Sequence, residues 1–266
     1  MRRTPVVFIH GLWIHSSAWA PWIDHFRQAG YEPIAPGWPG DSATVAETRA
    51  HPELLAGQGI DDIADHYASI IDGLGSAPVL VGHSFGGLIA QKLLGLNLAR
   101  SAVAIDPGQI KGVKPLPFAQ LRSGFPILGR PGNRKRTVSL TAKQFRYGFG
   151  NAIPEAESNE LFARFAIPGP GRPLFQSAAA NFRSASPARV EVGNNDRGPL
   201  LFVSGGRDHT VPDVVTRAAY KLYAKSSATT ELKQFPDRGH SLIFDHGWRE
   251  VADFVRSWLE AKIPAN

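Results

Sequence analysis

Gly82-His83-Ser84-Phe85-Gly86 is the stretch that decides the fold, because the sequence on both sides agrees with it. The apolar run before it, residues 79–81, is typical of a buried strand, and residues 87–94 after it have the composition of a helix. Glycines on both sides of Ser84 permit a sharp turn between these elements. The sequence therefore predicts a strand, a tight turn and a helix, with the serine hydroxyl exposed above the edge of a sheet.

Short apolar runs alternate with amphipathic stretches through most of the chain. Strands are predicted at residues 6–9, 31–35, 79–81, 102–105, 200–203 and 230–235, and helices at 17–29, 60–74, 213–223 and 248–259. This alternation predicts an α/β fold, with a mostly parallel, doubly wound sheet of about six strands and helices on both faces.

The strand ends hold most of the polar residues that suggest chemistry. In parallel sheets, active sites form at the carboxyl ends of the strands. His10, Ser84, Asp106 and Asp208 are all expected at that edge, and His240 follows the last predicted strand. The sequence therefore predicts one site built from five residues that are far apart in the chain.

The strand and helix alternation is absent between residues 107 and 196. Prolines, glycines and basic residues interrupt short helices there, which are predicted at residues 141–149, 154–165 and 174–182. We therefore divide the chain into a core of residues 1–106 and 197–266 and a mainly helical cap inserted at residues 107–196.

The excess positive charge of the chain lies in this predicted cap. The formal net charge is +6; residues 107–196 contain 13 Lys and Arg but five Asp and Glu, whereas the rest contains 16 and 18. The densest run is Arg134-Lys135-Arg136. Two interpretations stay open, a solvated basic face and a lid that attracts anionic substrates or surfaces. No nucleic-acid-binding signature accompanies the charge, so no nucleic-acid partner is expected.

Composition excludes several other classes of protein and site. The chain has no cysteine, which excludes disulfides, thiolate metal sites and a cysteine nucleophile. No stretch approaches the roughly 18 apolar residues of a membrane span, and the apolar run at residues 6–9 is too short for a signal-peptide core. We expect a cytoplasmic protein with no membrane span. No metal-ligand spacing is visible, and neither a metal nor an organic cofactor is expected; the oligomeric state is left open.

The order of serine, acid and histidine along the chain resembles the α/β-hydrolase superfamily, in particular serine esterases and lipases with a helical cap. The matching pieces are His10-Gly11, the turn around Ser84, Asp208 within residues 205–212, and His240 after Gly239. The resemblance covers nearly the whole chain. It implies a sheet that begins at the third of the family's usual eight strands, with the cap inserted after the sixth.

The resemblance also implies a role for each residue of the predicted site. Ser84 would be the nucleophile, and because a serine hydroxyl needs an adjacent base, His240 is the candidate for that role. Asp208 would orient the imidazole. Asp106, directly after the predicted strand at residues 102–105, is the alternative acid, or a residue that shapes the pocket.

Donors for an oxyanion and a substrate pocket are expected at the same edge. The backbone N–H groups of Leu12 and Phe85 are the expected donors. Six side chains are expected near the substrate: His10, Trp13, Trp38, His83, Phe145 and Leu242. For each of them the alternative is structural packing between the cap and the core.

Together these residues favour a serine hydrolase that cleaves an ester, lactone or related small-molecule acyl substrate through an acyl-enzyme on Ser84. Three alternatives stay open: perhydrolysis like that of cofactor-free haloperoxidases, hydrolysis of a carbon–carbon bond by the same triad, and non-catalytic ligand binding. Serine at position 84 argues against epoxide hydrolases and haloalkane dehalogenases, which have an aspartate there. Ser241 argues against hydroxynitrile lyases, which have a lysine beside the histidine.

Overall fold

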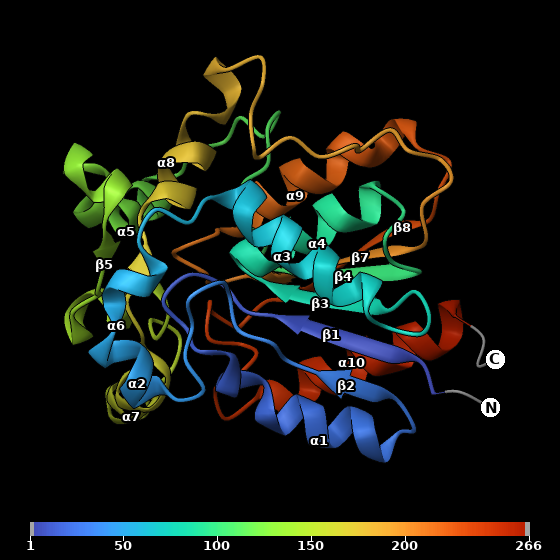
Figure 1. Cartoon of the computed structure of the whole chain (residues 1–266), viewed down its shortest axis with the longest axis horizontal. Coiled ribbons are helices and arrows are strands. Elements are labelled where there is room, and N and C mark those ends of the chain that lie inside the picture. The colour runs from blue at the N-terminus through green and yellow to red at the C-terminus, as the bar shows by residue number, and fades with distance from the viewer. Residues whose placement is uncertain (1–2, 264–266) are drawn as a thin grey trace.

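A six-stranded parallel sheet forms the centre of the structure, a computed structural model that describes residues 3–263 (Figure 1). The strand order is β2-β1-β3-β4-β7-β8, and each neighbouring pair is parallel. The strands are β1 (Pro5–Ile9), β2 (Glu32–Ile34), β3 (Val79–His83), β4 (Ser101–Ile105), β7 (Leu200–Gly205) and β8 (Thr230–Phe235). The predicted α/β fold with a six-stranded parallel sheet is confirmed.

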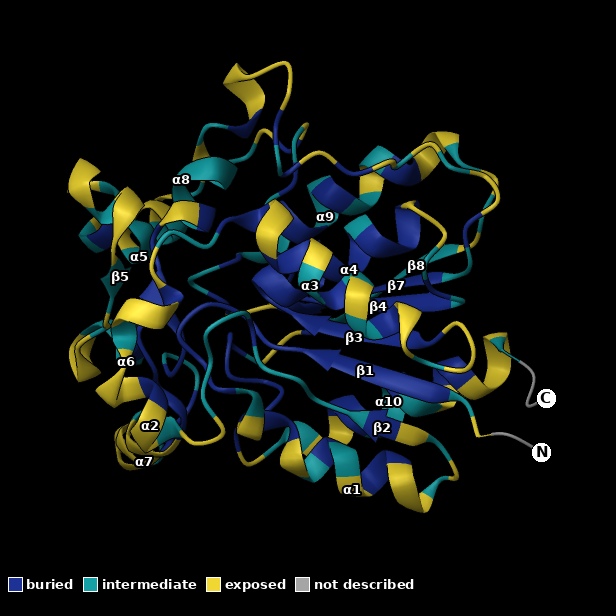
Figure 2. Ribbon diagram, in the orientation of Figure 1, coloured by how far each residue is buried: buried dark blue, intermediate teal, exposed yellow. Residues whose placement is uncertain are grey.

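Helices cover both faces of this sheet (Figure 1). One face is covered by α1 (Ala20–Gln28) and α10 (Trp248–Lys262), and the other by α3 (Ile60–Asp72), α4 (Phe85–Gly95) and α9 (Asp213–Leu222). Every residue of β1, β3, β4 and β7 is buried, as the dark blue strands of Figure 2 show. This explains why these strands read as continuous apolar runs instead of alternating ones.

Aromatic packing fixes α1 on its face of the sheet. The Phe8 ring of β1 lies 5.0 Å from Trp19, 6.0 Å from Trp22 and 5.3 Å from Phe26. All four side chains are fully buried. The Trp22 and Phe26 rings meet Phe8 edge-on, and pairs of this kind add about 0.5–1.5 kcal/mol each to the free energy of apolar burial, so α1 is held firmly beside the strand that leads to the site.

The segment between β4 and β7 adds no strand to the sheet within its described residues, 106–199. It forms α5 (Phe118–Leu128), α6 (Ala142–Gly148), α7 (Glu155–Phe165) and α8 (Arg172–Ala178), with a small antiparallel pair of β5 (Thr137–Val138) and β6 (Gly169–Pro170). These elements lie at the carboxyl ends of the sheet strands (Figure 1). They are joined there by α2 (Val45–Ala50), whose Arg49 donates to the Phe162, Ala163 and Ala166 carbonyl oxygens at 2.8–3.1 Å.

Residues 183–199 return from α8 along the core. Lys92 of α4 donates to the Pro187 carbonyl at 3.0 Å, and Asn194 donates to the Gly95 carbonyl at 2.9 Å. Residues 183–196, which the sequence assigns to the cap, thus lie along α4 and not over the strand ends (Figure 1).

Two helices, α2 and α5, escape prediction from the sequence. The six-residue α2 is too short for a recognisable periodicity and depends on the Thr44–Glu47 capping box. In α5 the one buried residue is Ile127, and Pro126 lies inside the helix. Proline usually ends or kinks a helix, so Pro126 argues against a helix at these residues when the sequence is considered alone. No helix among residues 3–263 has the length and apolarity needed to cross a bilayer.

Candidate active site

Ser84 occupies the turn between β3 and α4 in a strained backbone conformation, with a φ of 55°. A positive φ in a non-glycine residue of this kind costs on the order of 1–3 kcal/mol and persists where the surroundings hold it. Here the Ser84 N–H donates to the Ile105 carbonyl at 2.9 Å, and the Ser84 carbonyl accepts from Gly108 at 2.7 Å. The neighbouring strand β4 and the loop after it therefore hold the turn.

The glycines on either side of Ser84 are required by close backbone approaches. A Cβ at Gly82 would lie 2.1 Å from the Gly86 carbonyl oxygen, and a Cβ at Gly86 would lie 2.1 Å from the Ile9 carbonyl oxygen. Both distances are far below van der Waals contact. The helix α4 can therefore start directly behind the serine and pack against β1 only because these positions have no side chain.

His240 and Asp208 form a buried hydrogen-bonded pair. His240 Nδ1 lies 2.5 Å from Asp208 Oδ2, and both side chains are fully buried. The other oxygen, Asp208 Oδ1, accepts from the backbone N–H groups of Thr210 at 2.6 Å and Val211 at 2.9 Å. Because the carboxylate oxygens accept, Nδ1 is the donor and His240 Nε2 is left as a proton acceptor. Among the described residues, that Nε2 atom has no hydrogen-bond partner.

Asp106 lies beside this pair but is bonded differently. Its Oδ1 accepts from the Gly205 N–H at 2.7 Å, and its buried Oδ2 has no partner within residues 3–263. Burial raises the pKa of Asp106 well above its ordinary value, and the Asp208 carboxylate raises it further. Asp106 therefore favours its neutral form. Of the two candidate acids, Asp208 is the one hydrogen-bonded to His240.

His83 and Phe149 enclose the His240 imidazole. The His83 ring lies 4.5 Å from the His240 ring, and its Nε2 donates to the His240 carbonyl at 2.9 Å. Burial lowers the pKa of His83 well below its ordinary value, with the nearby His240 as a second cause, so His83 is neutral. Phe149 contacts the same ring edge-on at 4.8 Å. These contacts hold the imidazole in one orientation.

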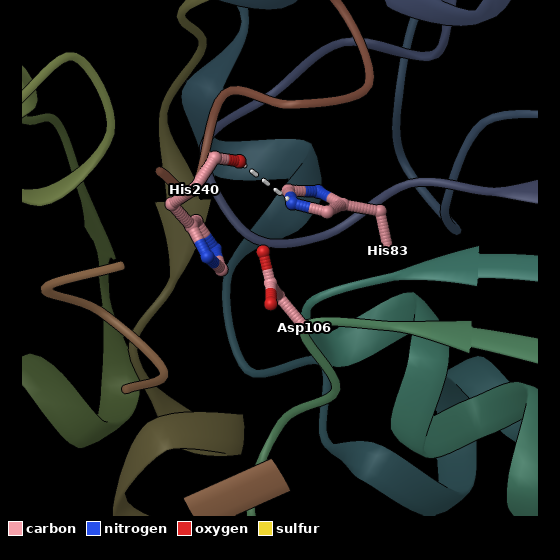
Figure 3. Close-up of side chains that lie close together, drawn as sticks. All are labelled: His83, Asp106 and His240. Carbon is pink, nitrogen blue, oxygen red and sulfur yellow. Dashed lines mark hydrogen bonds between the residues drawn. The ribbon is translucent and has the colours of Figure 1, made fainter. Parts of the chain in front are cut away.

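Figure 3 shows the Asp106 carboxyl group pointing toward the His240 ring, with His83 beside it. One possible ligand atom from each of these three residues lies within 4.8 Å of the others, which is the spacing of a potential metal site. His240 Nδ1 is already bonded to Asp208 and His83 Nε2 to a carbonyl. A metal would therefore use the Nε2 atom of His240 that a general base needs.

The two predicted oxyanion donors flank Ser84. Phe85 is the first residue of α4, and the first N–H groups of a helix have no acceptor within it. On the other side, a Cβ at Gly11 would lie 2.6 Å from Ser84 Cβ and 3.2 Å from Ser84 Oγ. The Gly11–Leu12 backbone thus runs directly against the serine side chain.

A small pocket of about 90 Å³ opens at Ser84. Trp13 and Val211 line it from the core, and Leu121, Leu128 and Leu174 line it from the cap. Polar groups are few and comprise Gln109, Gln120, Ser123, Ser177 and Thr210. The pocket is therefore an apolar space with a few hydrogen-bonding groups at its wall.

Trp13 is the one of the six predicted pocket side chains that lines this space with Ser84. It has a positive φ of 66°, and its indole N–H donates to the Val138 carbonyl at 3.0 Å, which joins the core loop to the cap. The sequence did not single out Leu121, Gly124 and Leu128 of α5 as pocket residues. Their i, i+3, i+7 spacing is a helical signal that could have identified them.

The other five predicted pocket residues lie outside the lining. His83 packs on His240, as described above. His10 contacts Asp41 at 2.9 Å and stacks on Trp38 at 5.1 Å, so His10 and Trp38 belong to an internal network next to the carboxyl end of β1. Phe145 is fully buried and stacks on Phe149 at 5.0 Å. Leu242 is fully buried in the core.

Solved structures with this arrangement of elements are numerous, and three illustrate them. The monoacylglycerol lipase of Paleococcus ferrophilus is 21% identical, with a TM-score of 0.67 over 97% of this chain and 94% of that chain. An extracellular alpha/beta-hydrolase from a Paenibacillus species is 18% identical, with a TM-score of 0.68 over 98% and 99%. A methylesterase from Arabidopsis is 15% identical, with a TM-score of 0.64 over 96% and 98%.

At such low identity these structures establish the fold alone. No curated protein sequence matches this chain. The sequence profile of the alpha/beta hydrolase family, in contrast, matches residues 6–254, which span both parts of the core and everything between them. The chain therefore belongs to the alpha/beta hydrolase family.

Proposed function

We propose that this hydrolase cleaves esters with short acyl groups through an acyl-enzyme on Ser84. The observation that supports this most directly is the 2.5 Å hydrogen bond between Asp208 and His240. It leaves His240 Nε2 as a proton acceptor at the same edge of the sheet where Ser84 lines the pocket. A serine hydroxyl attacks a carbonyl only when an adjacent base removes its proton.

In the proposed cycle, His240 Nε2 takes the Ser84 proton while Oγ attacks the ester carbonyl. The negative charge that develops on the carbonyl oxygen is stabilised by the N–H groups of Phe85 and Leu12. His240 then returns the proton to the departing alcohol, and a water activated by the same nitrogen releases the acid. His240 Nε2 does not hydrogen-bond to Ser84 in the structure, and such catalytic bonds commonly tighten only in the substrate complex.

The size of the pocket favours a short acyl chain. Its volume of about 90 Å³ is well below the roughly 300–1,000 Å³ of pockets that enclose drug-sized ligands. Trp13, Leu121 and Leu174 make the walls apolar. We therefore expect acetyl to butyryl esters to be cleaved faster than octanoyl esters.

The test is hydrolysis of p-nitrophenyl acetate, butyrate and octanoate by the wild type, by Ser84→Ala and by Ser227→Ala. Ser227 is an exposed serine on the core and serves as the matched control. We expect turnover to be lost in Ser84→Ala alone, and a fluorophosphonate probe to modify Ser84 as seen by mass spectrometry. Equal activity in Ser84→Ala, or a probe adduct at another serine, would refute the proposal.

A further inference from the structure

Helix α5 exposes large apolar side chains to solvent. Phe118 is 77% exposed and Phe125 is 72% exposed, and Leu116, just before the helix, is 58% exposed. A shallow groove of about 490 Å³ lies between α5 and α6, lined by both phenylalanines together with Arg122, Lys143 and Tyr147. Clustered exposed aromatic residues usually mark a surface that binds something. We call Leu116 and the residues that line this groove the α5 surface.

The charge around the α5 surface has one sign. Residues 107–154 contain nine Lys and Arg and no Asp or Glu. Six of these cations are exposed: Arg122 and Lys143 line the groove, and Arg130, Arg134, Lys135 and Arg136 follow α5 along the chain. Within residues 3–263, none of the six forms an ion pair with a carboxylate, whereas basic residues of the core such as Arg217 and Arg249 do. The positive charge is therefore available to an external partner.

The α5 surface is also the outer wall of the pocket at Ser84. Leu121 and Ser123 line the groove on one side of α5 and the catalytic pocket on the other. Ile127 is the single buried residue of α5, and much of the helix is exposed in Figure 2. The helix therefore buries little side-chain surface against the rest of the protein. A partner bound to the groove would therefore lie one helix away from Ser84.

We propose that the α5 surface binds the surface of an anionic lipid membrane. Exposed phenyl rings on α5, with unpaired cations on α5, on α6 and in the segment between them, match a bilayer interface, where anionic headgroups lie directly above an apolar layer. A free anion would pair with the cations but would leave Phe118 and Phe125 in water. This proposal concerns binding and does not depend on the esterase proposal.

The test is sedimentation of the full chain with vesicles, in a Ser84→Ala background so that no lipid is hydrolysed. We expect binding to phosphatidylcholine vesicles that contain phosphatidylglycerol, little binding to phosphatidylcholine alone, and release when salt rises from about 0.05 M to about 0.5 M. Phe118→Ser/Phe125→Ser should abolish sedimentation. Arg134→Ser/Lys135→Ser should weaken partitioning about 10- to 30-fold, since each cation near the surface contributes about 1 kcal/mol.

Matched controls are available on the core. Leu96 is 54% exposed and Lys221 and Lys225 are exposed, so Leu96→Ser and Lys221→Ser/Lys225→Ser remove similar groups elsewhere. These variants should bind like the parent, and thermal melts should show that all variants are folded. Absence of binding to anionic vesicles at low salt overturns the proposal. Binding that survives Phe118→Ser/Phe125→Ser, or that falls equally in the controls, also overturns it.

Discussion

The substitution Asp208→Asn is expected to inactivate the enzyme through the tautomer of His240 rather than through the fold. In the structure, Asp208 Oδ1 accepts from the Thr210 and Val211 N–H groups at 2.6 and 2.9 Å, while Oδ2 accepts from His240 Nδ1 at 2.5 Å. An asparagine must turn its oxygen toward the two N–H groups, so its NH₂ group faces the imidazole. That group can only donate, which forces Nδ1 to be an acceptor and moves the ring proton to Nε2.

An imidazole with its proton on Nε2 cannot accept the proton of Ser84. Loss of the acid in a triad of this kind lowers kcat by about 10⁴-fold, or about 5 kcal/mol of transition-state stabilisation. In this protein we expect about 10³-fold, because Asp106 lies beside the pair. The Asp208 carboxylate contributes to the raised pKa of Asp106, so its removal lets Asp106 ionise more readily and supply a negative charge near His240.

The assay is kcat for p-nitrophenyl acetate between about pH 6 and pH 9, together with thermal melts to verify folding. We expect Asp208→Asn to lose about 10³-fold, Asp106→Asn to stay within a few-fold of the wild type, and the double variant to lose at least another tenfold. The reasoning is wrong if Asp208→Asn retains nearly full activity, or if Asp106→Asn alone shows the large loss.

Three further predictions concern stability and selectivity. The pKa of Asp106 is raised in the folded protein, so the contribution of this carboxyl group to stability is complete below about pH 4 and is lost as the pH rises. The variant Asp106→Asn should therefore melt at a higher temperature than the wild type, by a difference that grows with pH in thermal scans from pH 4 to pH 9. Each kcal/mol of this difference corresponds to about 2–4 °C. Gly86→Ala would place a Cβ 2.1 Å from the Ile9 carbonyl and should cost at least about 3 kcal/mol in urea unfolding, whereas Gly132→Ala, with open space around it, should not. Leu174→Ala should raise the octanoate-to-acetate ratio of kcat/KM about tenfold, because it enlarges the apolar pocket.

The sheet and the residues at its edge could be predicted from the sequence because both depend on local signals. A buried parallel strand is a short apolar run, and the predicted runs at residues 79–81 and 102–105 lie within the buried strands β3 and β4. The carboxyl ends of parallel strands meet at one edge of a sheet, so the order of the strands along the chain is enough to bring Asp208 and His240 together. Their hydrogen bond is a consequence of topology more than of any one motif.

The pocket could not be predicted, because its walls depend on how the cap helices pack. Phe145 and Phe118 are both aromatic residues of the cap, yet the first is fully buried against Phe149 and the second is 77% exposed. Nothing in the sequence near either residue separates the two outcomes. Helix α5 contributes Leu121 and Leu128 to the pocket but leaves Phe118 and Phe125 in solvent, so its apolar spacing alone does not tell which side chains form the pocket wall.

Backbone strain in the described residues is concentrated at the carboxyl edge of the sheet. Among the described residues, four non-glycine residues have a positive φ, and three of them, Trp13, Ser84 and Asp106, follow the adjacent strands β1, β3 and β4. Each such residue costs on the order of 1–3 kcal/mol. The buried strands behind them offset this cost, and the loops in front need no regular structure. Since the strain recurs at three neighbouring strand ends, we infer that the rigid sheet is what holds the serine, the pocket wall and the second acid in place.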